Sequence, residues 1–224
     1  MTARYRGILF DLDGTLVDSL DLILASYRHT MKTHLGRVPP DDEWKNTMGT
    51  PLRAQLQSFA SSPEQAESMF RTYIEHNEAN HERLIRTFPG MREAAVALRR
   101  AGYRLAVVTS KLGANAEREL RTCGLDGLFD GLVSASDVRR PKPDPEPVVM
   151  GLQSIELPAE DALLVGDSLY DLQAGRAAGV DTAAALWGPF DRQHLAAGQP
   201  DHWLETIDQL LVLLNAEPWK GNGG

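Results

Sequence analysis

The stretch ILFDLDGTLVDS, residues 8–19, decides the fold of this chain. Its apolar run ends at Asp11, a second aspartate follows at Asp13, and Gly14 comes directly after it. A short apolar run bounded by a polar residue and a glycine is typical of a buried strand that ends in a turn. Charged side chains rarely follow a buried strand so closely unless they have a partner or a function. The stretch therefore predicts a buried strand whose carboxyl end carries two functional carboxylates.

Other short apolar runs along the chain resemble this first strand, and helical patterns separate the later ones. Strands are predicted over residues 5–11, 104–109, 129–135, 162–166 and 181–186. Helices are predicted over residues 90–101, 113–123, 145–155 and 169–178, with a final amphipathic helix over 203–216. Because strand and helix alternate, the pattern predicts an α/β fold built on a doubly wound parallel sheet.

The alternation fails between the first strand and the second. Residues 17–86 contain helical stretches and no clear strand, and a crossover between parallel strands needs far fewer residues. We therefore expect a core made of residues 1–16 and 87–224, with a small all-helical domain, residues 17–86, inserted after the first strand. The chain would pass between the two near residues 16–19 and 86–90, and the end of the chain, WKGNGG, is expected to fray.

Composition narrows the functional class. The net charge is −8 and no basic block is present, which argues against nucleic acid or an anionic membrane as the main partner. No apolar run approaches the roughly 18 residues that span a bilayer. Cys123 is the only cysteine, so an intrachain disulfide is impossible, and a cytoplasmic location is expected. Composition does not distinguish a monomer from a homodimer.

Polar side chains follow four of the predicted strands or their connections. They are Asp11, Asp13 and Gly14 after the first strand, Thr109, Ser110 and Lys111 after the second, Lys142 in RRPKPDPEP, and Asp167 and Asp171 in GDSLYD. In an open parallel sheet these ends meet in one crevice. Clustered carboxylates need a cation, and an oxygen-rich site without thiols favours Mg²⁺, which prefers phosphate oxygens among its other ligands. The crevice therefore predicts phosphoryl transfer.

The motifs DLDGT, VVTS, RPKP and GDSLYD occur in the order found in the haloacid dehalogenase (HAD) superfamily. The chain resembles the phosphatase branch of that superfamily, in which a helical cap is inserted after the first strand of a Rossmann-like core. The resemblance covers essentially the whole chain. It implies a Mg²⁺-dependent phosphatase that acts on a small phosphorylated metabolite through an aspartyl-phosphate.

By this resemblance Asp11 would be the nucleophile, and Asp13 would act first as general acid and then as general base. Mg²⁺ would be bound by Asp11, Asp167 and the main-chain carbonyl of Asp13. Asp171 would orient that shell or Lys142.

The remaining core motifs would bind the phosphoryl group. Thr109 and the main chain of Ser110 would contact its oxygens, and Lys142 would offset charge on both the nucleophile and the transferring group. Gly14 would let the main chain pass close to the phosphate.

The substrate is expected to be selected by the helical insert. The stretches LASYRHTM and EHNEANHERLIRTFPG are similar to the cap of bacterial HAD-type pyrophosphatases, close relatives of phosphoglycolate phosphatases. Arg53 and Lys111 are candidates for binding a second anionic group of the substrate. On this reading small phosphomonoesters such as 2-phosphoglycolate rank slightly ahead of inorganic pyrophosphate.

Three alternatives stay open at this point. Dehalogenation uses the first aspartate but needs neither Asp13 nor the GDSLYD pattern, which argue against it. A phosphomutase of the β-phosphoglucomutase type shares all four motifs and differs in how its cap keeps water from the phosphoenzyme. A catalytically silent binding protein on the same fold is the third, since a fold does not by itself establish a function.

Overall fold

The computed structural model describes residues 4–217 and shows a six-stranded sheet in which all neighbouring strands are parallel. The strands across the sheet are β5 (Gly131–Val133), β4 (Arg104–Val108), β1 (Gly7–Phe10), β6 (Ala162–Gly166), β7 (Asp181–Ala185) and β8 (His202–Leu204). Phe10 at the end of β1 lies opposite Val107 of β4 and Val165 of β6. The chain builds outward from β1 in both directions, so strand order reverses there. The predicted doubly wound α/β fold is confirmed.

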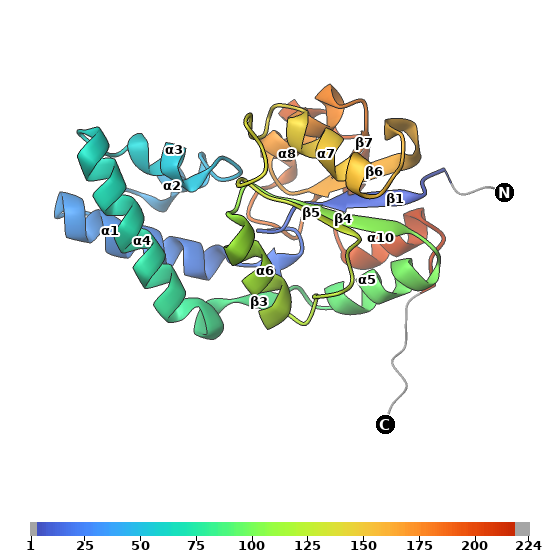
Figure 1. Ribbon diagram of the computed structural model, residues 1–224, viewed down its shortest axis with the longest axis horizontal. Coiled ribbons are helices and arrows are strands. Elements are labelled where there is room, and N and C mark those ends of the chain that lie inside the picture. The colour runs from blue at the N-terminus through green and yellow to red at the C-terminus, as the bar shows by residue number, and fades with distance from the viewer. Residues whose placement is uncertain (1–3, 218–224) are drawn as a thin grey trace.

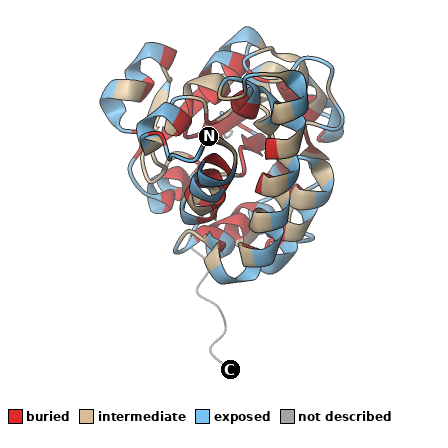
Figure 2. Cartoon of the chain, turned by 90° about the vertical axis from the view of Figure 1, so that its left-hand side faces the viewer, coloured by how far each residue is buried: buried red, intermediate tan, exposed pale blue. Residues whose placement is uncertain are grey.

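Helices cover both faces of the sheet, as Figure 1 shows. One face packs against α5 (Met91–Arg100), α6 (Gly113–Thr122) and α10 (Ile207–Leu213), and the other against α7 (Glu146–Ser154) and α8 (Leu169–Ala177). Side chains of β1 alternate accordingly: Ile8 and Phe10 belong to the first apolar cluster and Leu9 to the second. Because β1 is buried on both faces, its sequence is a continuous apolar run. Figure 2 shows the buried residues gathered inside these layers.

Four helices stand together beside the carboxyl edge of the sheet, at the left of Figure 1. They are α1 (Leu20–Leu35), α2 (Asp41–Lys45), α3 (Leu52–Gln57) and α4 (Pro63–Leu84). Local signals set their ends: the Ser62 side chain accepts a hydrogen bond from the N–H of Gln65 at the start of α4, and Gly36 ends α1 in a left-handed conformation. Tyr27 stacks on Trp44 at a centroid distance of 4.7 Å inside this group.

Two short strands frame the four helices. β2 (Val17–Asp18) enters the helical segment and β3 (Arg86–Thr87) leaves it, and the two pair antiparallel. This pairing was not predicted, because a two-residue strand is too short to show a period in the sequence. It brings the two connections of the helical segment side by side.

The C-terminal region differs from the prediction. A single helix over residues 203–216 is wrong: β8 (His202–Leu204) adds a sixth strand beside β7, and α10 begins only at Ile207. The carbonyl of Leu204 accepts a hydrogen bond from the N–H of Leu186, so pairing at the sheet edge overrides the local helical pattern. The shorter helices are α9 (Arg192–Leu195) and two 3₁₀ turns, Ala159–Asp161 and Ala196–Gly198. The predicted fraying of 219–224 lies outside the described residues.

Across residues 4–217, every helix is too short or too polar to cross a bilayer.

Candidate active site

The turn after β1 carries Asp11 and Asp13 at the centre of the carboxyl edge of the sheet. The N–H of Asp11 still donates to the carbonyl of Val165 in β6, at 3.0 Å, and so continues the strand ladder. The chain then turns at Gly14, which adopts a φ of +83°. A side chain at this position would also collide with the carboxylate of Asp167, so the turn needs glycine for both its backbone and its space. Both aspartates therefore line one cavity.

Lys142 lies beneath Asp11 and connects it to Asp171. Its Nζ is 2.6 Å from Oδ1 of Asp11, 2.5 Å from Oδ1 of Asp171 and 3.0 Å from the carbonyl oxygen of Val108. Burial opposes the charge of the ammonium, but the two carboxylates outweigh burial and raise the pKa of Lys142. Burial also raises the pKa of Asp11 to about 7, since the opposing charge of Lys142 offsets only part of the desolvation and Asp171 adds repulsion.

The loop after β6 brings a second pair of carboxylates to the same place. Ser168 begins α8 with a capping box: its side chain accepts from the N–H of Asp171, whose carboxylate accepts from the N–H of Ser168. Both oxygens of Asp171 are thus engaged, one by Lys142 and the other by Ser168. Asp167 accepts at Oδ1 from the Thr15 hydroxyl, at 2.7 Å. Several hydrogen bonds thus hold this loop, and of its two aspartates only Asp167 has a carboxylate oxygen without a donor among the described residues.

Asp11, Asp167 and Asp171 form a buried acidic cluster, with one carboxylate oxygen of each within 4.8 Å of the others. Burial, reinforced by the charges of Asp11 and Asp171, raises the pKa of Asp167 well above its ordinary value. Within the described part of the chain, no group donates a hydrogen bond to Oδ2 of Asp11 or to Oδ2 of Asp167. These two oxygens fit a hard cation, whose charge would offset the burial and the mutual repulsion that raise the pKa of Asp11 and of Asp167.

The loop after β4 supplies the predicted hydroxyl groups. Thr109 is buried, and its hydroxyl accepts a hydrogen bond from the N–H of Lys111 at 3.1 Å. Ser110 lines the cavity and its hydroxyl donates to the carbonyl of Gly49, at 2.6 Å. Gly49 belongs to the segment between α2 and α3, so this hydrogen bond joins the core to the helical insert. The described conformation thus has the helical insert in contact with the site.

The side chain of Lys111 points to Asp13, which makes it a direct neighbour of the site. Its Nζ is 2.8 Å from Oδ1 of Asp13 and forms an ion pair with Glu119 of α6. Ser19 donates to the same Asp13 oxygen at 2.5 Å. Sequence reasoning missed Glu119. A signal was present, since Glu119 shares the buried face of α6 with Ala116 and Leu120, where an acid is unusual.

A cavity of about 360 Å³ lies between these strand ends and the helical insert. The insert contributes a mainly apolar wall with Ile23, Met48, Leu52, Phe70, Tyr73 and Ile74, and it adds the polar side chains of Thr50, Gln55 and Asn77. Arg53 also lines this wall, but its guanidinium forms an ion pair with Glu67 and lies 3.8 Å from the ring centre of Phe70. None of the described histidines lines the cavity. The predicted core residues thus meet in one site, and Arg53 stands at its opposite wall.

The sequence also matches a known protein family. The family model of haloacid dehalogenase-like hydrolases matches residues 8–185, a span that begins in β1 and ends with β7. The chain belongs to this family. The predicted superfamily and the predicted class of enzyme, a hydrolase, are confirmed.

Individual relatives cover almost the whole chain. A PpaX protein of Caldanaerobacter subterraneus is 38% identical over 211 residues, covering 94% of this chain and 95% of its own. The pyrophosphatase PpaX of Bacillus velezensis is 36% identical, covering 93% and 95%. A crystal structure of a predicted phosphoglycolate phosphatase from Haemophilus somnus superposes with a TM-score of 0.87 at 25% identity, covering 95% of this chain and 99% of the other. The family's architecture, insert included, thus spans this chain.

Proposed function

We propose that the chain is a Mg²⁺-dependent phosphatase that hydrolyses a small phosphorylated metabolite through an aspartyl-phosphate on Asp11. The observation that carries the proposal is the arrangement of Lys142 between Asp11 and Asp171, with Asp167 beside them, at the end of the central strand. The lysine holds one oxygen of Asp11 and leaves the other facing the cavity. A carboxylate held in this way is oriented for attack on phosphorus.

Mg²⁺ would be held by the open oxygens of Asp11 and Asp167 and by the main-chain carbonyl of Asp13. When bound, it would offset the negative charge of the phosphoryl oxygens during transfer. Asp171 would bind no metal, because both of its oxygens already accept hydrogen bonds from Lys142 and Ser168. Its function would be to hold Lys142 in place.

In the first step Asp11 forms a bond to phosphorus as the bond from phosphorus to the leaving oxygen breaks, and Asp13 gives that oxygen a proton. In the second step Asp13 takes a proton from water, which attacks the phosphorus and releases phosphate and free Asp11. Lys142, Thr109 and the main chain of Ser110 would neutralise or bind the phosphoryl oxygens in both steps. Two separate carboxylates are needed because one bonds to phosphorus while the other moves protons.

Residues 17–86 would act as the cap of this site. The hydrogen bond from Ser110 to Gly49 supports this assignment, because it joins the insert to a core residue that lines the cavity, and so does the pairing of β2 with β3, which brings the two connections of the insert together. Closure of such a cap would exclude bulk water from the aspartyl-phosphate. Arg53 would contact the leaving group, provided that it exchanges its ion pair with Glu67 for the substrate.

Two observations bear on the substrate. The names of the PpaX relatives favour inorganic pyrophosphate. The apolar wall of the cavity instead favours a leaving group that carries carbon, such as 2-phosphoglycolate. The two substrates differ in the charge that the cap must bind, because pyrophosphate leaves a second phosphate.

The test is phosphate release by the purified protein with Mg²⁺, comparing pyrophosphate, 2-phosphoglycolate and β-glucose 1-phosphate. Release that depends on Mg²⁺ and is abolished by Asp11→Asn is the expected result, and the highest kcat/KM identifies the substrate class. Release by the Asp11→Asn variant would overturn the nucleophile. Formation of glucose 6-phosphate in place of phosphate would indicate a phosphomutase, and inactivity towards all three substrates would contradict the proposed substrate range.

A further inference from the structure

A chain of charged side chains runs from Asp13, at the cavity, to the buried Glu119, away from the reacting centre. Lys111 binds Asp13 on one side and Glu119 on the other. Glu119 is 1% exposed, although it lies on a helix that otherwise presents charged residues to solvent. A carboxylate is buried to this degree only at considerable cost, and the ammonium of Lys111 is its one hydrogen-bond partner among residues 4–217.

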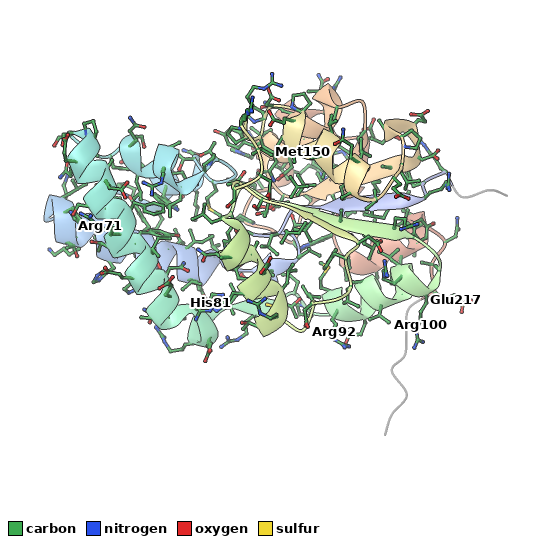
Figure 3. All side chains as sticks on the ribbon, viewed as in Figure 1. Arg71, His81, Arg92, Arg100, Met150 and Glu217 are labelled. Atoms are coloured by element: carbon green, nitrogen blue, oxygen red, sulfur yellow. The ribbon has the colours of Figure 1, made fainter. Side chains whose placement is uncertain are left out.

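The insert covers the Glu119 end of this chain. His81, near the C-terminal end of α4, lies with its Nε2 3.8 Å from Oε1 of Glu119, and Figure 3 shows it where α4 runs beside α6. Neither ring nitrogen of His81 nor the second oxygen of Glu119 has a hydrogen-bond partner in the described part of the chain. Glu119 therefore gains little from its surroundings except its contact with Lys111. A residue kept only for stability would be better satisfied.

We propose that Glu119 is a positioning residue for the proton-transfer group Asp13 and acts on it through Lys111. The inference rests on the proposed function, in which Asp13 protonates the leaving oxygen. Lysine has a long, flexible side chain, and a single contact would not hold its ammonium in one place. With Glu119 behind it, Lys111 is fixed at both sides and stays against Oδ1 of Asp13.

The two carboxylate oxygens of Asp13 therefore differ in their hydrogen bonding. Oδ1 accepts hydrogen bonds from both Lys111 and Ser19, whereas no described group donates to Oδ2. The anchored oxygen sets the orientation of the carboxyl group, and Oδ2 is left to exchange a proton with the leaving oxygen. When Glu119 loses its charge, Lys111 loses its anchor and Asp13 loses its orientation.

The test uses leaving groups that differ in their need for a proton. Phenolate is a poorer leaving group than 4-nitrophenolate, so hydrolysis of phenyl phosphate depends more on a well-placed acid, while the two substrates are almost equal in shape. In Glu119→Gln we expect kcat/KM for phenyl phosphate to fall at least ~10-fold and that for 4-nitrophenyl phosphate ~3-fold or less, as a misplaced general acid predicts. Glu117→Gln is the matched control, because Glu117 lies on the same helix and is 60% exposed. It should leave both values unchanged.

A second variant covers the case in which Glu119→Gln does not fold. Lys111→Met with Glu119→Leu replaces the buried ion pair by apolar side chains of similar size, a change that proteins often tolerate. It should show the same selective loss for phenyl phosphate. An equal loss for both substrates, or no loss, in a folded variant would overturn the inference and leave the proposed function intact. If the unaltered protein with Mg²⁺ releases phosphate neither from these two substrates nor from pyrophosphate and 2-phosphoglycolate, the proposed function itself fails.

Discussion

Replacing Asp11 by asparagine should make the stability of the Mg²⁺-free protein less dependent on pH. Burial raises the pKa of Asp11 from 3.8 to about 7 in the folded protein, while in the unfolded chain it returns to its ordinary value. Between these two values the folded protein binds a proton that the unfolded chain has released. Stability therefore falls as the pH rises through this range. Asparagine has nearly the same size and no titrating proton, so the variant lacks this contribution.

The size of the effect follows from the shift. Between pH 8 and pH 6 the folded carboxyl group passes through its midpoint, while the unfolded one stays ionised. Wild type should therefore gain about 1.4 kcal/mol of unfolding free energy over Asp11→Asn on acidification across this interval. For a chain of this length that corresponds to about 3–6 °C in Tm. Asp167 adds to this difference. Burial and the charge of Asp11 raise the pKa of Asp167 in wild type, so Asp11→Asn brings that pKa closer to its ordinary value and further reduces the pH dependence of stability.

The assay is thermal unfolding of both proteins with a chelator at pH 6, 7 and 8. Burial lowers the pKa of His76 and of His81, which opposes the effect of Asp11, but both histidines are present in both proteins and cancel in the difference. The Tm of Asp11→Asn minus that of wild type should decrease as the pH falls. A difference that does not change with pH would refute a raised pKa. Such a constant difference would mean that Lys142 outweighs burial at Asp11, because a carboxylate that is ionised in both states contributes no pH dependence between pH 6 and pH 8.

Three further predictions concern the metal, the lysine and the insert. Mg²⁺ should raise the Tm of wild type more at pH 8 than at pH 6, because protons compete with the ion for Asp11 and Asp167. If the rise in Tm is equal at both pH values, or equally large in Asp11→Asn, the ion binds at another place. Lys142→Met should lower kcat for phosphate release by a factor of ~10²–10⁴, since the nucleophile loses its orientation and its compensating charge, and an unchanged kcat would exclude this function. Gly49→Ala should reduce kcat/KM, because Gly49 has a φ of +95° and a Cβ there would lie 2.8 Å from Oγ of Ser168. Gly36→Ala, with a φ of +68° and no neighbour within 4 Å, is its control; equal kcat/KM in both variants would show that the contact between insert and core does not matter.

The sequence alone determined the class of fold and the content of the site. Strands buried on both faces appear as short apolar runs, and the ends of parallel strands meet at one edge, so Asp11, Thr109 and Asp167 could be assigned to one crevice without coordinates. The helical insert could be recognised because its length exceeds what a crossover needs. These properties depend on local composition and on the order of elements, both of which can be read along the chain.

The tertiary structure alone decided which charged groups touch. The family resemblance already implied that Lys142 offsets the charge of Asp11, and it left open whether Asp171 orients Lys142 or the metal shell. The structure shows that Asp171 contacts Lys142 and that Glu119 reaches Asp13 through Lys111, between side chains whose separation in sequence carries no period. The sixth strand is a second example, since residues 203 and 204 were predicted to be helical from the local pattern but pair with β7 as part of β8. The local sequence pattern indicates which face of its own helix or strand a residue occupies. Contacts between elements depend on how whole faces pack, and in a buried site those contacts set the pKa values and the orientation of each reacting group.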